Sequence, residues 1–144
     1  MNETSRVLVD TARTCLGTPF YHQGRVAGIG LDCIGLVIHA MKQIGITVSD
    51  ERDYGREPQG DKLHAALINH GFTKHELESE DDIVAGDVLL FRFNGEPQHV
   101  GLAVSSTAMV HSYAPIGRVV ETGLGETWLR RVAGVYRLPK LHQE

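Results

Sequence analysis

A cysteine and two histidines are the residues of this sequence best suited to nucleophilic catalysis. Cys33 lies where a glycine-rich run, GTPFYHQGRVAGIG (17–30), gives way to the apolar stretch CIGLVIHAM (33–41). His99 and His111 each interrupt an apolar run further along the chain. A thiolate is a strong nucleophile, and it is commonly paired with a histidine that a third polar group holds in place. The three residues therefore predict acyl transfer through a cysteine, such as the hydrolysis of an amide bond.

The residues around Cys33 predict that its thiol is reactive. Asp32 is a typical N-cap residue, so Cys33 is expected in the first turn of a helix. The partial positive charge of a helix N-terminus lowers the pKa of a thiol and favours the thiolate. Gly24, Gly28 and Gly30 allow the chain to pass close to a substrate, which makes Gly24 a candidate binding residue. The alternative is a buried cysteine that only packs, the commoner role of an isolated cysteine.

Whether the two histidines act together depends on the register of the hairpin that carries them. A turn centred on Ser106 pairs Gly101 with His111. It also pairs His99 with Tyr113, and both histidines then share one face of the sheet. A turn centred half a residue later would place them on opposite faces. The catalytic interpretation therefore requires a turn with an odd number of residues, and the alternative is two ordinary core histidines.

The elements that must position these residues are helices first and strands afterwards. Apolar residues recur on one helical face over 3–16, from 33 to about 44 and near 63–69, and residues 49–60 are a polar loop. Short β-branched or aromatic segments separated by turn residues then predict strands over 87–93, 99–105, 108–114, 117–122 and 132–138. This order favours an α+β fold in which N-terminal helices pack on a C-terminal antiparallel β-sheet.

Length and composition exclude several other classes of protein. The 144 residues contain no linker or repeat, so residues 1–144 are predicted to form a single domain. The net charge is -4 and no basic cluster is present, which argues against binding to nucleic acid or an anionic membrane. No secretory signal is recognisable, so the chain is expected to be made in the cytoplasm. Two cysteines form no disulfide framework and no residues have metal-ligand spacing, so neither a metal nor another cofactor is expected.

Five short motifs in order resemble those of the NlpC family of papain-like cell-wall cysteine peptidases: GTPFYHQG, DCIGLV, GDVLLFRF, HVGLAV and MVHSYA. The likeness runs from about Gly17 to Pro139. The sequence is most similar to the branch of the family found in phage and gene-transfer-agent tails. The segments that carry this similarity are GTPFYHQGR, DYGREP and RVAGVYRLP. The resemblance implies the papain-like NlpC fold, with Cys33 as nucleophile, His99 as general base and acid, and His111 as the group that orients the His99 ring.

The resemblance also implies a substrate and a setting. Members of the family hydrolyse peptidoglycan stem peptides, commonly at the bond from D-γ-glutamate to the diamino acid. A relative from the tail branch would be associated with a virion or tail, would act in the periplasm or cell wall, and would have tail proteins as partners.

Two positions depart from the family pattern, and both concern recognition of the free amine of the substrate. Family members often have tyrosine where this chain has Phe20, and serine where it has Ile34. Asp32 is still available to pair with an ammonium group. Tyr21 is a candidate to supply the hydroxyl that is missing at Phe20. Asp32, Tyr21 and Gly24 are therefore the predicted substrate-binding residues.

Two other functions remain open from the sequence. One is a non-enzymatic hub or plug subunit of a tail that keeps the fold, which the intact Cys33, His99 and His111 argue against. The other is a papain-like amidase or acyltransferase, which would keep the thiol chemistry and act on lipids or other amides. The absence of an apolar tail argues against lipid substrates.

Overall fold

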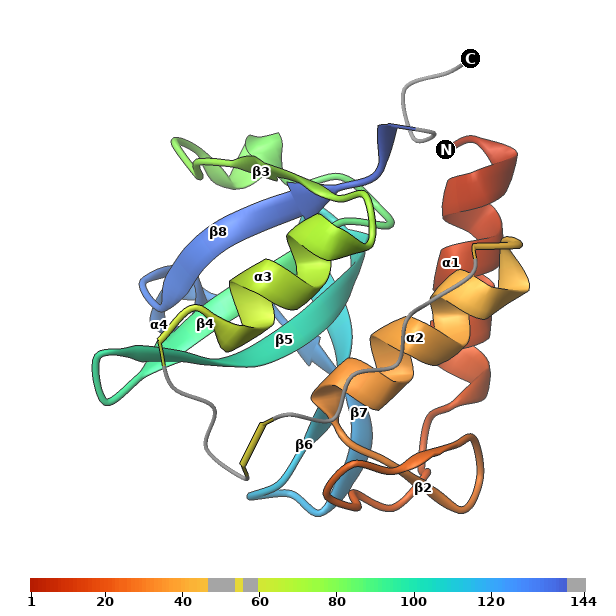
Figure 1. Ribbon diagram of the computed structural model, residues 1–144. Coiled ribbons are helices and arrows are strands. Elements are labelled where there is room, and N and C mark those ends of the chain that lie inside the picture. Colours follow the sequence, from red (N-terminus) through yellow and green to blue (C-terminus); the bar gives the residue numbers. More distant parts are fainter. Residues whose placement is uncertain (47–53, 56–59, 140–144) are drawn as a thin grey trace.

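Residues 1–46, 54–55 and 60–139 are described by the computed structural model, and they form helices on both faces of an antiparallel sheet (Figure 1). Most of the predicted loop over 49–60 lies outside the described residues. The α-helices are α1 (Glu3–Thr14), α2 (Cys33–Gln43), α3 (Lys62–Asn69) and α4 (Glu126–Leu129), and η1 (Glu80–Asp82) is a 3-10 helix. The strands are β1 (Arg25–Val26), β2 (Gly30–Leu31), β3 (Thr73–His75), β4 (Val88–Phe93), β5 (Glu96–Ser105), β6 (Ala108–Tyr113), β7 (Arg118–Gly123) and β8 (Val132–Arg137).

The main sheet has six strands in the order β3-β8-β4-β5-β6-β7, and every neighbouring pair is antiparallel. The five predicted strands are all present, with β5 starting three residues earlier than expected, at Glu96 rather than His99. The edge strand β3 was not predicted, because its three exposed residues carry no alternating pattern. The α+β fold class and the antiparallel pairing predicted from the sequence are confirmed.

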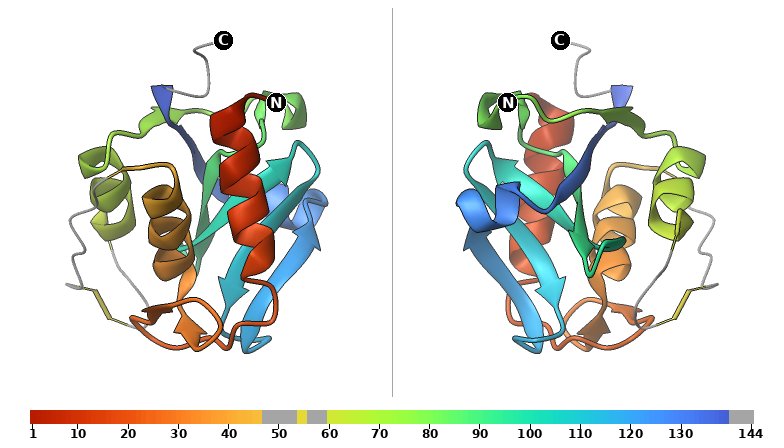
Figure 2. Two further views of the ribbon diagram at one scale, coloured as in Figure 1. Left: turned by 90° about the vertical axis from the view of Figure 1, so that its right-hand side faces the viewer. Right: turned by 90° about the vertical axis from the view of Figure 1, so that its left-hand side faces the viewer.

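Two apolar layers enclose the sheet because successive side chains of a strand point to opposite faces. On one face Val100 and Leu102 of β5 pack in a core that includes residues of α1, α2 and α3. On the other face Phe91 and Met109 pack with Trp128 and its neighbours in α4. Figure 2 shows α1 and α2 side by side against the sheet. The prediction of helices on one face therefore holds for the first three, and α4, which was not predicted, covers the opposite face.

Local capping sets the start and end of α2, the helix that carries the cysteine. The Asp32 carboxylate accepts a hydrogen bond of 2.7 Å from the backbone N–H of Gly35, which satisfies one of the free donors of the first turn. Helix α2 begins at Cys33 as predicted, and Gly45 follows its end with a φ of +79°, a backbone conformation that glycine adopts without strain. The cysteine is therefore held in the first turn by interactions among its near neighbours.

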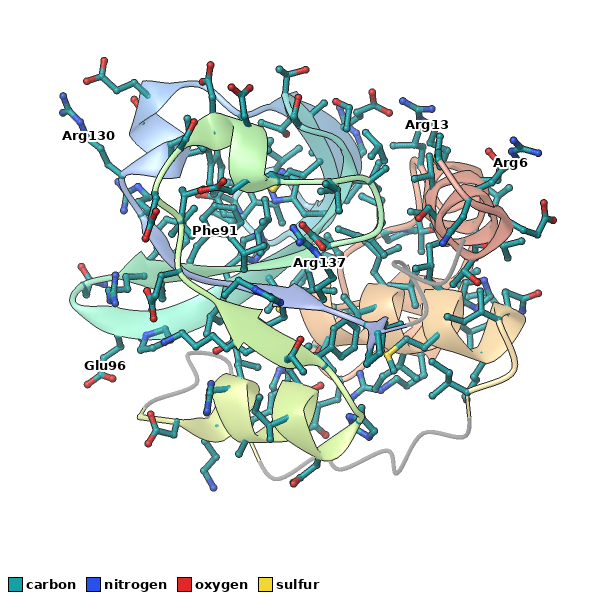
Figure 3. The ribbon with its side chains drawn as sticks, turned by 90° about the horizontal axis from the view of Figure 1, so that it is seen from above. Arg6, Arg13, Phe91, Glu96, Arg130 and Arg137 are labelled. Atoms are coloured by element: carbon teal, nitrogen blue, oxygen red, sulfur yellow. The ribbon has the colours of Figure 1, made fainter. Side chains whose placement is uncertain are left out.

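Several arginine side chains lie at the periphery of the molecule. Figure 3 shows Arg6, Arg13 and Arg130 pointing outward, whereas Phe91 lies in the interior. Among the described residues, no helix is both long and apolar enough to span a membrane.

Candidate active site

An open cleft of about 340 Å³ brings together segments that are far apart in the sequence. Cys33 enters it from the start of α2, and His99 enters it from β5. The other residues that line the cleft are Phe20, His22, Asp32, Phe93, Asn94, Gln98, Tyr113, Ala114 and Pro115. In the part of the chain that the structure describes, no three His, Cys, Asp or Glu side chains are grouped as metal ligands.

His99 and His111 form a buried pair behind the cleft. The Nε2 atom of His99 lies 2.7 Å from the Nδ1 atom of His111, a hydrogen-bond distance. The exposed fraction is 6% for His99 and 0% for His111. The expectation that the two side chains share one face of the sheet is confirmed, and one ring is placed to orient the other.

The hairpin reaches this register by a different route from the one expected. Leu102 pairs with Val110, the register of a turn centred on Ser106. Nearer the turn, however, Ser105 pairs with Ala108, so the turn itself contains two residues rather than an odd number. A register shift just before Ser105 inserts one residue into β5 and restores the parity. The requirement for an odd-residue turn was wrong, because a bulge has the same effect on side-chain direction.

Gly101, the residue opposite His111, makes room for the side chain of Met109. A Cβ atom added to Gly101 would overlap the sulfur of Met109 and would lie 3.4 Å from the Cβ atom of His111. The bare backbone at Gly101 therefore accommodates the Met109 side chain, whereas its distance to His111 is an ordinary van der Waals contact. The sequence analysis paired Gly101 with His111 but did not predict that the glycine was needed.

Aromatic rings pack around the histidine pair. The centroid of the Trp128 ring lies 5.2 Å from that of the His111 ring. The centroid of the Tyr113 ring lies 5.1 Å from those of both histidine rings. Burial lowers the pKa of His111 to about 4, and burial together with the neighbouring His111 lowers the pKa of His99 well below its usual value. Both rings are therefore neutral at pH 7, each with one N–H. Trp128 was missed by the sequence analysis, which had no means of placing a four-residue helix over this face.

The prediction that the pKa of the Cys33 thiol is lowered was wrong. Burial, and to a smaller extent the negative charge of Asp32, raises the pKa of Cys33 to about 12, although hydrogen bonds from backbone N–H groups, including that of Val100, oppose the change. The loss of hydration outweighs the partial charge of the helix N-terminus. The cleft therefore holds a neutral thiol and a neutral imidazole at rest, and the thiol must lose its proton as it attacks.

Alkylation tests this resting state. Cys15 is 0% exposed, whereas Cys33 is half-buried and lines the cleft, so iodoacetamide should modify Cys33 first. Because the thiolate is the reacting form, the rate at Cys33 should rise about tenfold per pH unit between pH 7 and 9. Mass spectrometry of peptides at timed intervals measures both rates. A rate that is already constant near pH 7 would indicate a preformed thiolate, and faster modification of Cys15 would contradict the assignment of the exposed thiol.

Asp32 does not have the free carboxylate that was predicted to bind a substrate ammonium group. Its Oδ1 atom accepts hydrogen bonds from the backbone N–H of Gly35 and from Arg25 at 3.0 Å. Its Oδ2 atom accepts from the backbone N–H of Gln23 at 2.9 Å and from the Tyr54 hydroxyl at 2.6 Å. The Arg25 side chain is 7% exposed and that of Asp32 4%, so the ion pair is shielded from solvent. The charge and hydrogen-bonding capacity of Asp32 are thus used within the protein.

Tyr21 and Gly24, the other predicted binding residues, do not line the cleft. Tyr21 is 67% exposed, and it is Phe20 that faces the cleft, so the Tyr21 hydroxyl does not replace the missing one. A Cβ atom on Gly24 would overlap the backbone of Gly30, and one on Gly35 would overlap the carbonyl oxygen of Gly24. The need for glycine at position 24 therefore comes from close packing of the chain on itself and on α2.

The chain is similar to known proteins in sequence and in structure. A sequence model described as the NlpC/P60 family matches residues 17–137. Comparison with curated protein sequences gave no match. Among solved structures, an NlpC/P60 family protein from Bacillus cereus ATCC 10987 superposes with a TM-score of 0.68 at 24% identity, over 92% of this chain and 39% of that one. The chain thus spans well under half the length of that relative.

Two further structures are similar in length to this chain. The NlpC/p60 domain of the peptidoglycan hydrolase SagA superposes with a TM-score of 0.68 at 21% identity, over 96% of this chain and 100% of that one. RipD from Mycobacterium tuberculosis is described as a non-catalytic NlpC/p60 domain protein adapted to peptidoglycan binding. It superposes with a TM-score of 0.62 at 14% identity, over 94% of this chain and 97% of that one. At these identities the likeness establishes a shared fold.

Proposed function

We propose a cysteine peptidase activity for this chain, which belongs to the NlpC/P60 family. The observation that carries the proposal is that Cys33 and His99 line one cleft, with the His111 ring hydrogen-bonded to His99 behind it. These groups supply a nucleophile, a base and an orienting partner. The substrate class we propose is the peptidoglycan stem peptide, supported by the name of SagA as a peptidoglycan hydrolase. The bond from D-γ-glutamate to the diamino acid is the one we expect to be cut.

The proposed reaction begins with attack of the Cys33 sulfur on the amide carbonyl carbon. His99 takes the thiol proton as the carbon–sulfur bond forms, because a thiol with a raised pKa does not ionise unaided. The backbone N–H of Cys33 is a candidate donor to the oxyanion. His99 then gives its proton to the leaving amine as the carbon–nitrogen bond breaks. Water, deprotonated by His99, hydrolyses the thioester and releases the carboxylic acid and the thiol.

We also propose that the protein is associated with a phage or gene-transfer-agent tail and acts in the periplasm or cell wall. The motifs GTPFYHQGR, DYGREP and RVAGVYRLP support this setting. Tail proteins would then be its partners, and residues 1–144 would act as a single peptidase domain. Detection of the chain in purified particles by mass spectrometry would test the association, and its absence from such particles would contradict it.

Digestion of purified peptidoglycan tests the activity itself. Mass spectrometry of the released fragments should identify peptides cut between D-γ-glutamate and the diamino acid. Release of intact stem peptides from the glycan would instead indicate an amidase. Binding to the sacculus without any release would favour a non-enzymatic role of the kind described for RipD.

Because the Asp32 carboxylate is already hydrogen-bonded within the protein, we expect cleavage not to require a free amine at the N-terminus of the substrate. Since Arg25 and Tyr54 already occupy this carboxylate of Asp32, a stem peptide with an acetylated N-terminus should be cleaved with a kcat/KM within about threefold of the free amine. Loss of a buried carboxylate–ammonium pair would cost about 2–5 kcal/mol, or roughly 30-fold or more. Cleavage rates of the acetylated and the free-amine peptide, measured by chromatography, test this prediction. A roughly 30-fold preference for the free amine would show that Asp32 contacts the substrate.

A further inference from the structure

The hydrogen-bonded chain behind the cleft does not end at His111. The Nε2 atom of His111 lies 2.8 Å from the Oγ1 atom of Thr122. Thr122 is on β7, where His111 pairs with Val120, so Thr122 is the diagonal neighbour of His111 across the two strands. The hydrogen-bonded chain therefore runs from His99 through His111 to the Thr122 hydroxyl. These three residues lie on three adjacent strands of the sheet, β5, β6 and β7.

Two proton arrangements satisfy this chain when both rings are neutral. In the first, His99 Nε2–H donates to His111 Nδ1, His111 Nε2–H donates to Thr122, and His99 Nδ1 carries a lone pair. In the second, Thr122 donates to His111 Nε2, His111 Nδ1–H donates to His99 Nε2, and His99 carries its proton at Nδ1. A base must have a lone pair, so only the first arrangement lets His99 Nδ1 accept the thiol proton.

The same arrangement is required once His99 is protonated. An imidazolium has N–H groups at both nitrogens, so His111 Nδ1 must then accept a hydrogen bond and the proton of His111 must lie on Nε2. That N–H needs an acceptor, because His111 is 0% exposed and an unpaired buried donor is costly. Thr122 Oγ1 is the acceptor within reach.

We propose that Thr122 is a positioning residue, whose hydroxyl oxygen accepts a hydrogen bond from His111 Nε2–H and thereby stabilises the tautomer in which His99 acts as a base and the positive charge that His99 acquires. The effect of Thr122 on catalysis rests on the proposed peptidase function. The tautomer itself does not depend on turnover, so it can be measured whether or not the chain hydrolyses peptidoglycan.

Nitrogen-15 NMR of the imidazole rings in the full chain at pH 7.5 tests the tautomer directly. In the wild type we expect His99 to carry its proton on Nε2 with a bare Nδ1, and His111 to carry its proton on Nε2. In Thr122→Val, which keeps the shape and removes the acceptor, the population of His99 protonated at Nδ1 should increase. A wild-type protein with His99 protonated at Nδ1, or an unchanged tautomer in Thr122→Val, would overturn the proposal.

Kinetics on stem peptides supply the second readout. Thr122→Val should lower kcat about 10- to 100-fold with KM changed less than about threefold, because the lost interaction strengthens as His99 becomes charged. Thr122→Ser retains the hydroxyl and should stay within about threefold of wild type. Thr73→Val, the matched change on the edge strand β3, should leave kcat unchanged. Equal kcat for Thr122→Val and wild type would refute the role, whereas an inactive wild type with the expected tautomer would refute only the peptidase function.

Discussion

Cys33→Ala is expected to lower the rate of stem-peptide hydrolysis by about 10⁴- to 10⁶-fold, because it removes the atom that forms the acyl bond. The half-buried thiol packs at the start of α2, and the Asp32 cap does not depend on it, so the fold should survive the change. Fragment release from purified peptidoglycan, followed by mass spectrometry, measures the loss. Circular dichroism of both proteins checks that the variant is folded.

Cys15→Ala is the matched control for the nucleophile. Cys15 is the other cysteine of the chain, and its side chain is buried in the core rather than in the cleft. This variant should keep the wild-type rate, with at most a modest loss of stability. A Cys33→Ala protein that still releases the same fragments would exclude a thiol mechanism, and the proposed peptidase function with it.

His99→Ala is expected to lower kcat by about 10²- to 10⁴-fold at pH 7. The effect should be large because the pKa of Cys33 is raised to about 12 and the thiol needs a base to ionise. The pH dependence gives a second signature. Since the variant depends on spontaneous ionisation, its residual rate should rise about tenfold per pH unit between pH 7 and 9, whereas the wild-type rate should change little.

His75→Ala is the matched control for the base. His75 is exposed on the edge strand β3, far from the cleft in the sheet order, and should tolerate alanine without loss of activity. The pH–rate profiles of the three proteins on one stem peptide provide the comparison. Wild-type activity in His99→Ala would reassign the base, and a flat residual profile would contradict the raised pKa of the Cys33 thiol.

The pKa of the nucleophile shows where reasoning from local sequence is insufficient. Asp32 and the apolar run after it correctly predict a helix that begins at Cys33. The same local pattern predicts a lowered pKa, because that prediction considers only the partial positive charge of the helix N-terminus. Desolvation in the folded protein is the larger effect, and it outweighs the opposing hydrogen bonds to the thiol, including the one from the backbone of Val100 on a distant strand.

Residue types, apolar periodicity and capping by themselves determined the α+β class, the start of α2, the positions of the five main strands and the candidacy of Cys33, His99 and His111. These features follow from interactions among residues that are close in the sequence, and such interactions are readable without coordinates.

Only the tertiary structure decided which polar groups are already satisfied. It placed Arg25 and Tyr54 on Asp32, turned Tyr21 away from the cleft, and brought Trp128 and Thr122 to the histidine pair. It also inserted the bulge in β5 that sets the register of the hairpin. These partners come from distant segments, so their effects on charge and hydrogen bonding arise only when packing removes water from between them.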